Sequence, residues 1–217
     1  MNASTLKLWQ LISPALPVGA YSYSQALEYV HFAGVVHDER SATLWLSDLL
    51  AHGVAKLDLP ILERVHRAWA AHDELAVRRL SRTLEARRET AELRFEDLAM
   101  GSALLQLLTN LGCAVPERRL PFASAFAVAA VNWAIPVDDA CAGYAWAWCE
   151  AQVAAAVKLV PLGHTAGQRM LLSLGLEIPA AVAAAAACRD DEIGSSLPGL
   201  AIASALHETQ YTRLFRS

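Results

Sequence analysis

Two Glu-x-x-His spacings are the residues of this sequence with the clearest capacity for chemistry: Glu28 with His31, and Glu63 with His66. On a helix, a separation of three residues places the carboxylate and the imidazole on one face, where both can bind the same metal ion. Two such motifs together with two further glutamates form the di-metal site of a ferritin-like bundle. The sequence therefore allows a di-metal helical-bundle oxidase as an alternative function.

The surroundings of the second motif argue against that metal site. His66 is flanked by Arg64 and Arg67, whose positive charges would repel a dication. The stretch between the two motifs, Ser41 to Ala55, contains no glutamate that could complete the ligand set. We therefore interpret the paired spacing as a coincidence, as short motifs often are.

A second candidate motif is the segment LVPLGHTAGQRMLL, in which Gly163 and Gly167 precede a predicted helix as in a phosphate-binding loop. The segment lacks a Gly-Lys-Ser or Gly-Lys-Thr triplet, and the residues before it, from Asp138, have a helical pattern instead of a strand pattern. We expect one helix to end at Pro161 and the next to be capped by Thr165.

The remaining histidines and the cysteines give no metal or nucleophile signature. The sequence contains no HxxxH and no CxxC spacing, and its four cysteines lie in apolar segments. Thiols of this kind indicate small buried side chains in a reducing compartment, so we predict a cytoplasmic protein with no cofactor, no metal site and no catalytic residues.

The composition is unusually apolar for a chain of 217 residues: 55% of the residues are hydrophobic, 18% are charged and the mean hydropathy is +0.29. A compact monomer of this composition exposes apolar surface, which favours a protein partner or a self-interface. The net charge of -4 and the pI near 6.0 exclude the basic surface on which nucleic-acid binding depends.

Two uncharged stretches raise the question of a membrane span, Leu8 to Leu27 and Leu120 to Val137. Prolines interrupt the first, and Pro121 and Pro136 bracket the second, so neither provides the length of about 20 apolar residues that a spanning helix needs. We predict neither a membrane anchor nor an export signal.

The hydrophobic spacing is helical throughout, which predicts an all-α, single-domain helical bundle over residues 1–217. The expected helices run from a cap at Asp38 or Ser41 towards Ala55, from Asp58 and Pro60 onward, from Leu80 to Leu111, between Pro121 and Pro136, from Asp138 through Val157, and after Thr165, Pro179 and Pro198.

The predicted helix from Leu80 to Leu111 is the longest, and Gly112 is placed to end it. Its apolar stripe comprises Leu84, Ala91, Phe95, Leu98 and Leu105. Its first half, EARRETAELRFED, carries charges of both signs, which we interpret as a solvated face.

The final residues, SALHETQYTRLFRS, mix apolar and cationic side chains. Leu214 and Phe215 stand between Arg213 and Arg216, a composition typical of an interface anchor. A segment that folds back on its own core would have the same composition, so both interpretations stay open.

Three segments together resemble the urease accessory proteins of the UreF type: SPALPVGAYSYSQALE, KLVPLGHTAGQRMLL and HETQYTRLFRS. Their order and spacing fit the family over essentially the whole chain. The sequence departs from the family pattern at Ala20 and Ala26, where glycine is frequent, at Lys158, where arginine is common, and at His164, where glutamine is common.

The resemblance implies a non-catalytic, all-α homodimer that binds accessory proteins of the UreD/UreH type, the nickel-delivering GTPase UreG and apo-urease. It would recruit the GTPase to apo-urease and couple GTP hydrolysis to nickel insertion. The residues that the resemblance nominates for partner binding are Tyr21, Ser22, Tyr23, Ser24, Glu28, Lys158, Gly163, Gln168, Arg169, His207, Glu208, Arg213 and Arg216.

Overall fold

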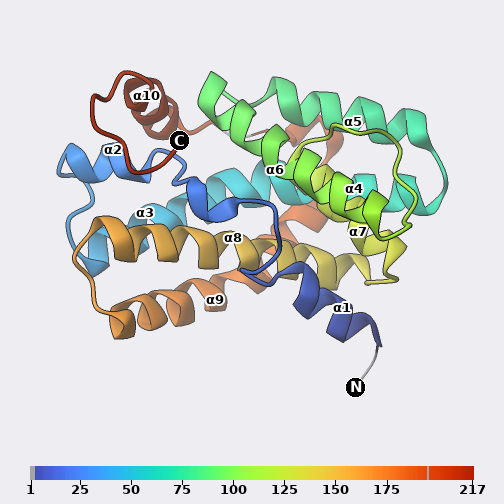
Figure 1. Cartoon of the computed structure of the whole chain (residues 1–217), viewed down its shortest axis with the longest axis horizontal. Coiled ribbons are helices and arrows are strands. Elements are labelled where there is room, and N and C mark those ends of the chain that lie inside the picture. Colours follow the sequence, from blue (N-terminus) through green and yellow to red (C-terminus); the bar gives the residue numbers. More distant parts are fainter. Residues whose placement is uncertain (1–2, 195) are drawn as a thin grey trace.

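The computed structural model describes residues 3–194 and 196–217, and it contains no strand within these ranges, which confirms the predicted all-α, single-domain bundle (Figure 1). Its helices are α1 (Ala3–Leu11), α2 (Leu27–Phe32), α3 (Glu39–Leu49), α4 (Leu59–Ala70), α5 (Glu74–Ala86), α6 (Ala91–Asn110), α7 (Phe122–Asn132), α8 (Val137–Leu159), α9 (His164–Ala187) and α10 (Pro198–His207). Short 3₁₀ turns lie at η1 (Ala20–Ser22) and η3 (Asp190–Glu192), and a π-helical segment, η2, spans Leu50–Asp58.

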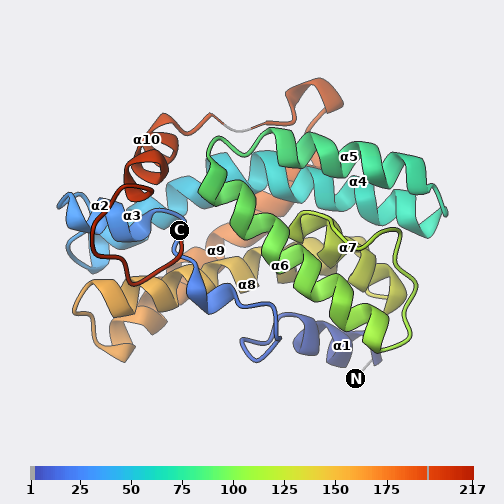
Figure 2. The same cartoon turned by 45° about the horizontal axis from the view of Figure 1, so that its top comes forward.

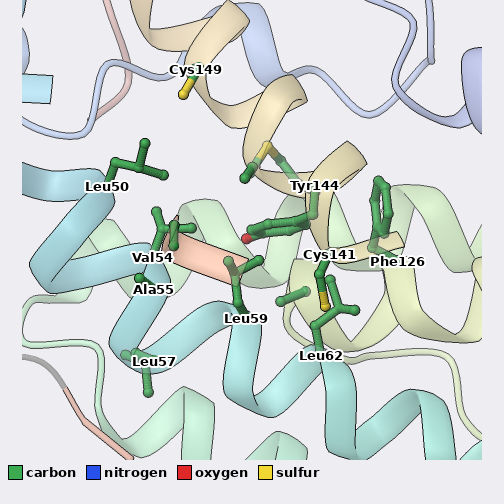
Figure 3. Close-up of a cluster of buried hydrophobic side chains, with 14 of the residues drawn as sticks. Leu50, Val54, Ala55, Leu57, Leu59, Leu62, Phe126, Cys141, Tyr144 and Cys149 are labelled. Carbon is green, nitrogen blue, oxygen red and sulfur yellow. The ribbon is translucent and has the colours of Figure 1, made fainter. Parts of the chain in front are cut away.

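Helix α7 is a buried core helix, and its side chains from Ala123 to Ala130 are all buried. It packs between α4 and α6, while α8 packs along α9 (Figures 1 and 2). Phe126 of α7 and Tyr144 of α8 meet edge to face at 5.4 Å between ring centroids, surrounded by the aliphatic side chains of η2 and α4 (Figure 3). The stretch Leu120–Val137, considered above as a span, therefore contains a short core helix.

The start of α3 agrees with the prediction from sequence. Asp38 caps the helix by accepting a hydrogen bond from the backbone nitrogen of Ser41 at 2.7 Å, and the Ser41 hydroxyl in turn accepts from the nitrogen of Asp38. These two bonds satisfy donors that the first helical turn leaves unpaired.

The prediction that Asp58 caps a separate helix was wrong. The helix from Glu39 runs on through η2 into α4, and Asp58 makes no capping bond. Pro60 lacks the N–H that an α-helix would direct to the carbonyl of Lys56, and that carbonyl instead accepts from the nitrogen of Gly194 at 2.9 Å. The wider π turn thus carries the chain past a proline that ordinarily ends a helix.

The predicted helix from Leu80 to Leu111 is in fact two helices, α5 and α6. Thr90 separates them and caps α6 by accepting a hydrogen bond from the backbone nitrogen of Leu93. Gly112 ends α6 in the left-handed conformation, with a φ of +75°. Because the two helices are separate, Phe95 leaves the proposed apolar stripe and is exposed. Gly101 does not interrupt α6 but allows close packing, since a Cβ there would overlap the carbonyl of Leu120.

The third correction concerns α9, which is one helix of 24 residues instead of two shorter ones. Pro179 lies inside it, and Gly163, not Thr165, occupies the N-cap position. Among the described residues, α9 is the one helix long and apolar enough to cross a membrane by length and composition. In the bundle, 28% of its apolar stretch is buried. The sequence-based argument overlooked this helix because Pro179 divided its apolar run.

Candidate functional site: the docked C-terminal segment

Residues His207–Ser217 fold back along the chain and lie beside the loop before α2 (Figures 1 and 2). Ser24 fixes the end of this segment, since its backbone nitrogen and its hydroxyl donate to the backbone oxygen of Ser217 at 2.9 and 2.5 Å. The nitrogen of Arg216 donates to the carbonyl of Ser22 at 2.8 Å. The first and third motifs, which are far apart in sequence, therefore form one surface.

Glu28 is the main anchor of this segment. Its side chain is buried, and its two oxygens accept the backbone nitrogens of Leu214 and Phe215 at 2.6 and 2.8 Å. A carboxylate can remain charged in the interior when donors surround it in this way. Glu28 thus converts a free backbone segment into a docked one.

His207, at the end of α10, lies between two carboxylates. Its Nδ1 is 2.7 Å from Oε2 of Glu92, and its Nε2 is 3.4 Å from Oε2 of Glu28. The other oxygen of Glu92 accepts from the Arg213 guanidinium at 2.7 Å. These contacts tie α2, α6, α10 and the C-terminal segment together in a chain of polar contacts.

A second buried glutamate, Glu96 of α6, receives the hydroxyl of Ser217 at 2.5 Å and the amide of Gln25 at 2.7 Å. The indole of Trp148 on α8 donates to the Gln25 amide oxygen at 2.9 Å. Burial raises the pKa of Glu96 to about 7, although both hydrogen bonds favour the charged carboxylate.

Phe215 and Lys158 join the second motif to the same place. The Phe215 side chain is buried, and the Lys158 ammonium lies 5.6 Å from its ring centroid, a cation–π distance. We call this assembly the tail site, and it comprises Ser22, Ser24, Gln25, Glu28, Glu92, Glu96, Trp148, Lys158, His207 and Arg213–Ser217.

The surface formed by the tail site and its neighbours Tyr21 and Tyr211 is apolar as well as cationic. Tyr211 is fully exposed, and Tyr21 and Leu214 are 74% and 67% exposed. The side chain of Arg213 is 39% exposed while it remains paired, and Arg216 is exposed. Exposed aromatic and arginine side chains are the residues that protein interfaces favour.

The nominated residues of the second motif divide between two places. Lys158 lies in the tail site, whereas Gly163, Gln168 and Arg169 lie at the start of α9. There Arg169 donates to Glu39 of α3 at 2.9 Å, joining the two helices. Of the other nominated residues, Tyr23 is buried near the tail site and Glu208 is exposed at its edge.

The comparison with known proteins agrees with the motifs that form the tail site. A family model described as UreF matches residues 36–175. The urease accessory protein UreF of Alkalilimnicola ehrlichii is 50% identical over 216 residues, which cover 97% of this chain and 95% of that protein. Proteins of the same name from an Azoarcus strain and from Chromohalobacter salexigens are 48% and 46% identical, over 98% and 97% of this chain and 95% and 93% of their own lengths. The chain belongs to the UreF family of urease accessory proteins.

Membership of the UreF family confirms that the chain has a role in urease maturation and is not an enzyme. The family model begins at residue 36 and ends at 175, so most of the tail site lies outside it. The relatives cover nearly the whole chain, which brings the first and third motifs within the similarity.

The di-metal alternative was wrong. His31 and His66 each contact a backbone carbonyl, of Val36 at 2.8 Å and of Ile135 at 3.0 Å. Glu63 pairs with Arg67, and Glu28 holds the C-terminal segment. Within residues 3–194 and 196–217, no group of three or more histidine, cysteine or carboxylate side chains is arranged to hold a metal ion.

The expectation of a solvated face over EARRETAELRFED was also wrong, because Arg88 is largely buried. Its guanidinium donates to Asp58 at 2.5 Å and to Asp97 at 2.7 Å, and the Tyr144 hydroxyl donates to Asp58 at 3.0 Å. Burial raises the pKa of Asp97, and the Arg88 charge opposes that rise. Burial and the nearby carboxylates raise the pKa of Tyr144 well above its ordinary value. This network, the Arg88 cluster, fixes α6 against η2 and α8.

A cavity of about 250 Å³ separates the tail site from the Arg88 cluster. Its lining includes Tyr23, Gln25 and Lys158 on one side and Arg88 and Tyr144 on the other. Of the polar side chains that line it, Gln25, Arg88 and Tyr144 are engaged in the hydrogen bonds given above. The loop before α2 therefore borders this cavity, and the hydrogen bonds of the tail site hold the loop in place.

Sequence reasoning missed several residues of the tail site: Gln25, Glu92, Glu96 and Trp148. One signal was present in the sequence. Glu92 and Glu96 stand four residues apart on a helix, where two carboxylates repel each other, so they need partners from outside the helix. Their partners come from the two ends of the chain, and spacing along the sequence does not reveal such contacts.

Proposed function

We propose that the tail site is the surface through which this chain binds its partners in urease maturation: an accessory protein of the UreD/UreH type and the GTPase UreG. The observation that carries this proposal is the docking of the third motif on the first through Glu28. Family membership supports the class of partner.

The docked segment supports recognition because it is ordered before a partner arrives. Its backbone is held by Ser22, Ser24 and Glu28, so binding need not supply the entropy cost of ordering it. Tyr211 and Leu214 then present apolar surface outward, next to the guanidinium groups of Arg213 and Arg216.

The proposed mechanism is recruitment without chemistry by this chain. The chain holds the nickel-loaded GTPase against apo-urease, and differential contacts with the GTP and GDP states of the GTPase couple hydrolysis to nickel insertion. We further propose that it works in the cytoplasm, which its free cysteines favour.

The outward-facing side chains provide the test. Replacing both Tyr211 and Leu214 by alanine is expected to weaken partner binding by about 2 kcal/mol, or roughly 30-fold in Kd, because exposed aromatic anchors dominate interface energies. The melting temperature should change by only about 2 °C, since neither side chain is buried. Binding is measured by calorimetry with each purified partner.

Leu75→Ala is the matched control, because Leu75 is 78% exposed on α5, at the other end of the molecule from α10 (Figure 1). It should leave both binding and melting temperature unchanged. Unchanged affinity of the double variant for both partners would refute the tail site as the binding surface.

We also propose that the chain forms a homodimer through the exposed face of α9. Leu172 and Leu176 are 73% and 84% exposed on this helix, and alanines continue the same apolar face toward its end. The interface would be the same surface on both copies, as two-fold symmetry requires. Light scattering should give twice 23.4 kDa. Leu176→Glu should give the monomer mass, and a monomeric unsubstituted chain would contradict the proposal.

A further inference from the structure

His207 is fully buried, yet both of its ring nitrogens face carboxylate oxygens. A neutral imidazole carries one N–H, so it can donate to Glu92 or to Glu28 but not to both. The doubly protonated imidazolium donates from both nitrogens and satisfies both carboxylates. The geometry of the tail site therefore fits the charged form.

Both glutamates also accept hydrogen bonds from other groups. Glu28 already accepts two backbone nitrogens, and Glu92 accepts the guanidinium of Arg213. Among the four groups joined by these contacts, the charges of two carboxylates, one imidazolium and one guanidinium sum to zero. Without the histidine proton, one negative charge stays unbalanced where little water can screen it.

We propose that His207 is a proton-operated clamp: binding of one proton to its imidazole docks the C-terminal segment, and loss of that proton releases it. The clamp would regulate partner binding only if the proposed function is right, because the docked segment would then form part of the partner-binding surface. The clamp itself is a property of the chain alone.

Several other charged groups lie around the imidazole and the segment. Glu28 of α2 and Glu92 of α6 face the imidazole, and Arg213 and Lys158 supply fixed positive charge. Glu96 contacts the segment at Ser217. Because its pKa is raised in the folded state, its ionisation opposes folding, and that cost grows from about pH 4.5 until it levels off above about pH 7.

Hydrogen exchange of the isolated full chain tests the clamp. The backbone nitrogens of Leu214 and Phe215 are bound to Glu28 only while the segment is docked. Their protection factors, corrected for intrinsic exchange with an unstructured peptide of the same sequence, should fall by about tenfold per pH unit where one proton is linked to docking. The measurement runs from about pH 5.5 to about pH 8.5, which extends roughly one pH unit or more to either side of the pKa of an unperturbed histidine side chain.

Two variants separate the two titrating groups. Glu96→Gln should keep the pH dependence that comes from His207, and the double variant with His207→Gln should lose it, because glutamine does not titrate. The amides of α7 report whether each variant is folded. If His207→Gln does not fold, Glu92→Gln takes its place, since it removes one of the carboxylates that favour the imidazolium.

Equal protection of the native segment at pH 5.5 and 8.5 would overturn the clamp, as would an unchanged slope in the folded double variant. Partner affinity, measured over the same pH range, distinguishes the two proposals. Protection that titrates while affinity stays constant supports the clamp and refutes its use in partner binding. Affinity lost in the Tyr211 and Leu214 variant, with protection that does not titrate, supports the proposed function alone.

Discussion

Replacement of Arg88 by methionine is expected to lower the free energy of unfolding by about 3–5 kcal/mol. Methionine nearly matches the arginine stem in length, but it leaves the carboxylates of Asp58 and Asp97 buried without their shared cation. The loss should shrink on acidification, because protonation removes the unpaired charges. Urea unfolding at about pH 7 and about pH 5 measures both effects.

Arg82→Met on the exposed face of α5 is the control for this experiment, and it should change stability by about 0.5 kcal/mol or less. A loss of similar size in both variants would mean that the Arg88 cluster has no special role. A loss for Arg88→Met that is equal at the two pH values would show that the buried carboxylates are not its cause.

Glu28→Gln is expected to release the C-terminal segment. The amide group of glutamine directs donors toward backbone nitrogens that are themselves donors, and it removes the negative charge facing His207. With at least one charged hydrogen bond lost and one donor left unsatisfied, docking should weaken by about 3 kcal/mol, or on the order of 100-fold. The exchange protection of Leu214 and Phe215 reports this loss directly.

Glu208→Gln is the matched control, since Glu208 is the exposed neighbour of His207 at the edge of the same segment. It should leave the exchange protection unchanged. Native protection in Glu28→Gln would mean that the contacts of Ser24 and Phe215 hold the segment without the carboxylate.

The fold could be predicted where a local signal ends an element. Asp38 and Ser41 cap α3 as expected, and Gly112 ends α6. The errors arose where tertiary contacts override local preference. Pro60 stays within a continuous helix because Gly194 satisfies the freed carbonyl, and such a contact cannot be anticipated from neighbouring residues.

One backbone conformation in the loop before α2 bears on a departure from the motif noted in the sequence. Ala26 has a φ of 62°, a left-handed conformation that costs an alanine about 1–2 kcal/mol and a glycine nothing. Position 26 is one of those at which the resemblance to the UreF motif led us to expect glycine. The departure was visible in the sequence, but its cost became clear only with the backbone conformation.

The tail site could be predicted only in part. The motifs identified Glu28, His207 and Arg213, although whether they contact a partner remains a prediction. Glu92 and Glu96 were taken for solvent-facing residues, because helical spacing does not reveal which charged side chains later meet a distant donor. Of the two interpretations of the final residues, the burial of Phe215 confirms that the segment folds back on its own chain.

The hydrogen bond from Ser24 to Ser217 joins residues 193 positions apart in the sequence. During translation, the loop before α2 leaves the ribosome long before the segment that covers it has been made. The bundle core can assemble in the meantime, but the proposed partner-binding surface cannot. A nascent or prematurely ended chain would therefore lack that surface even when its helices are already packed.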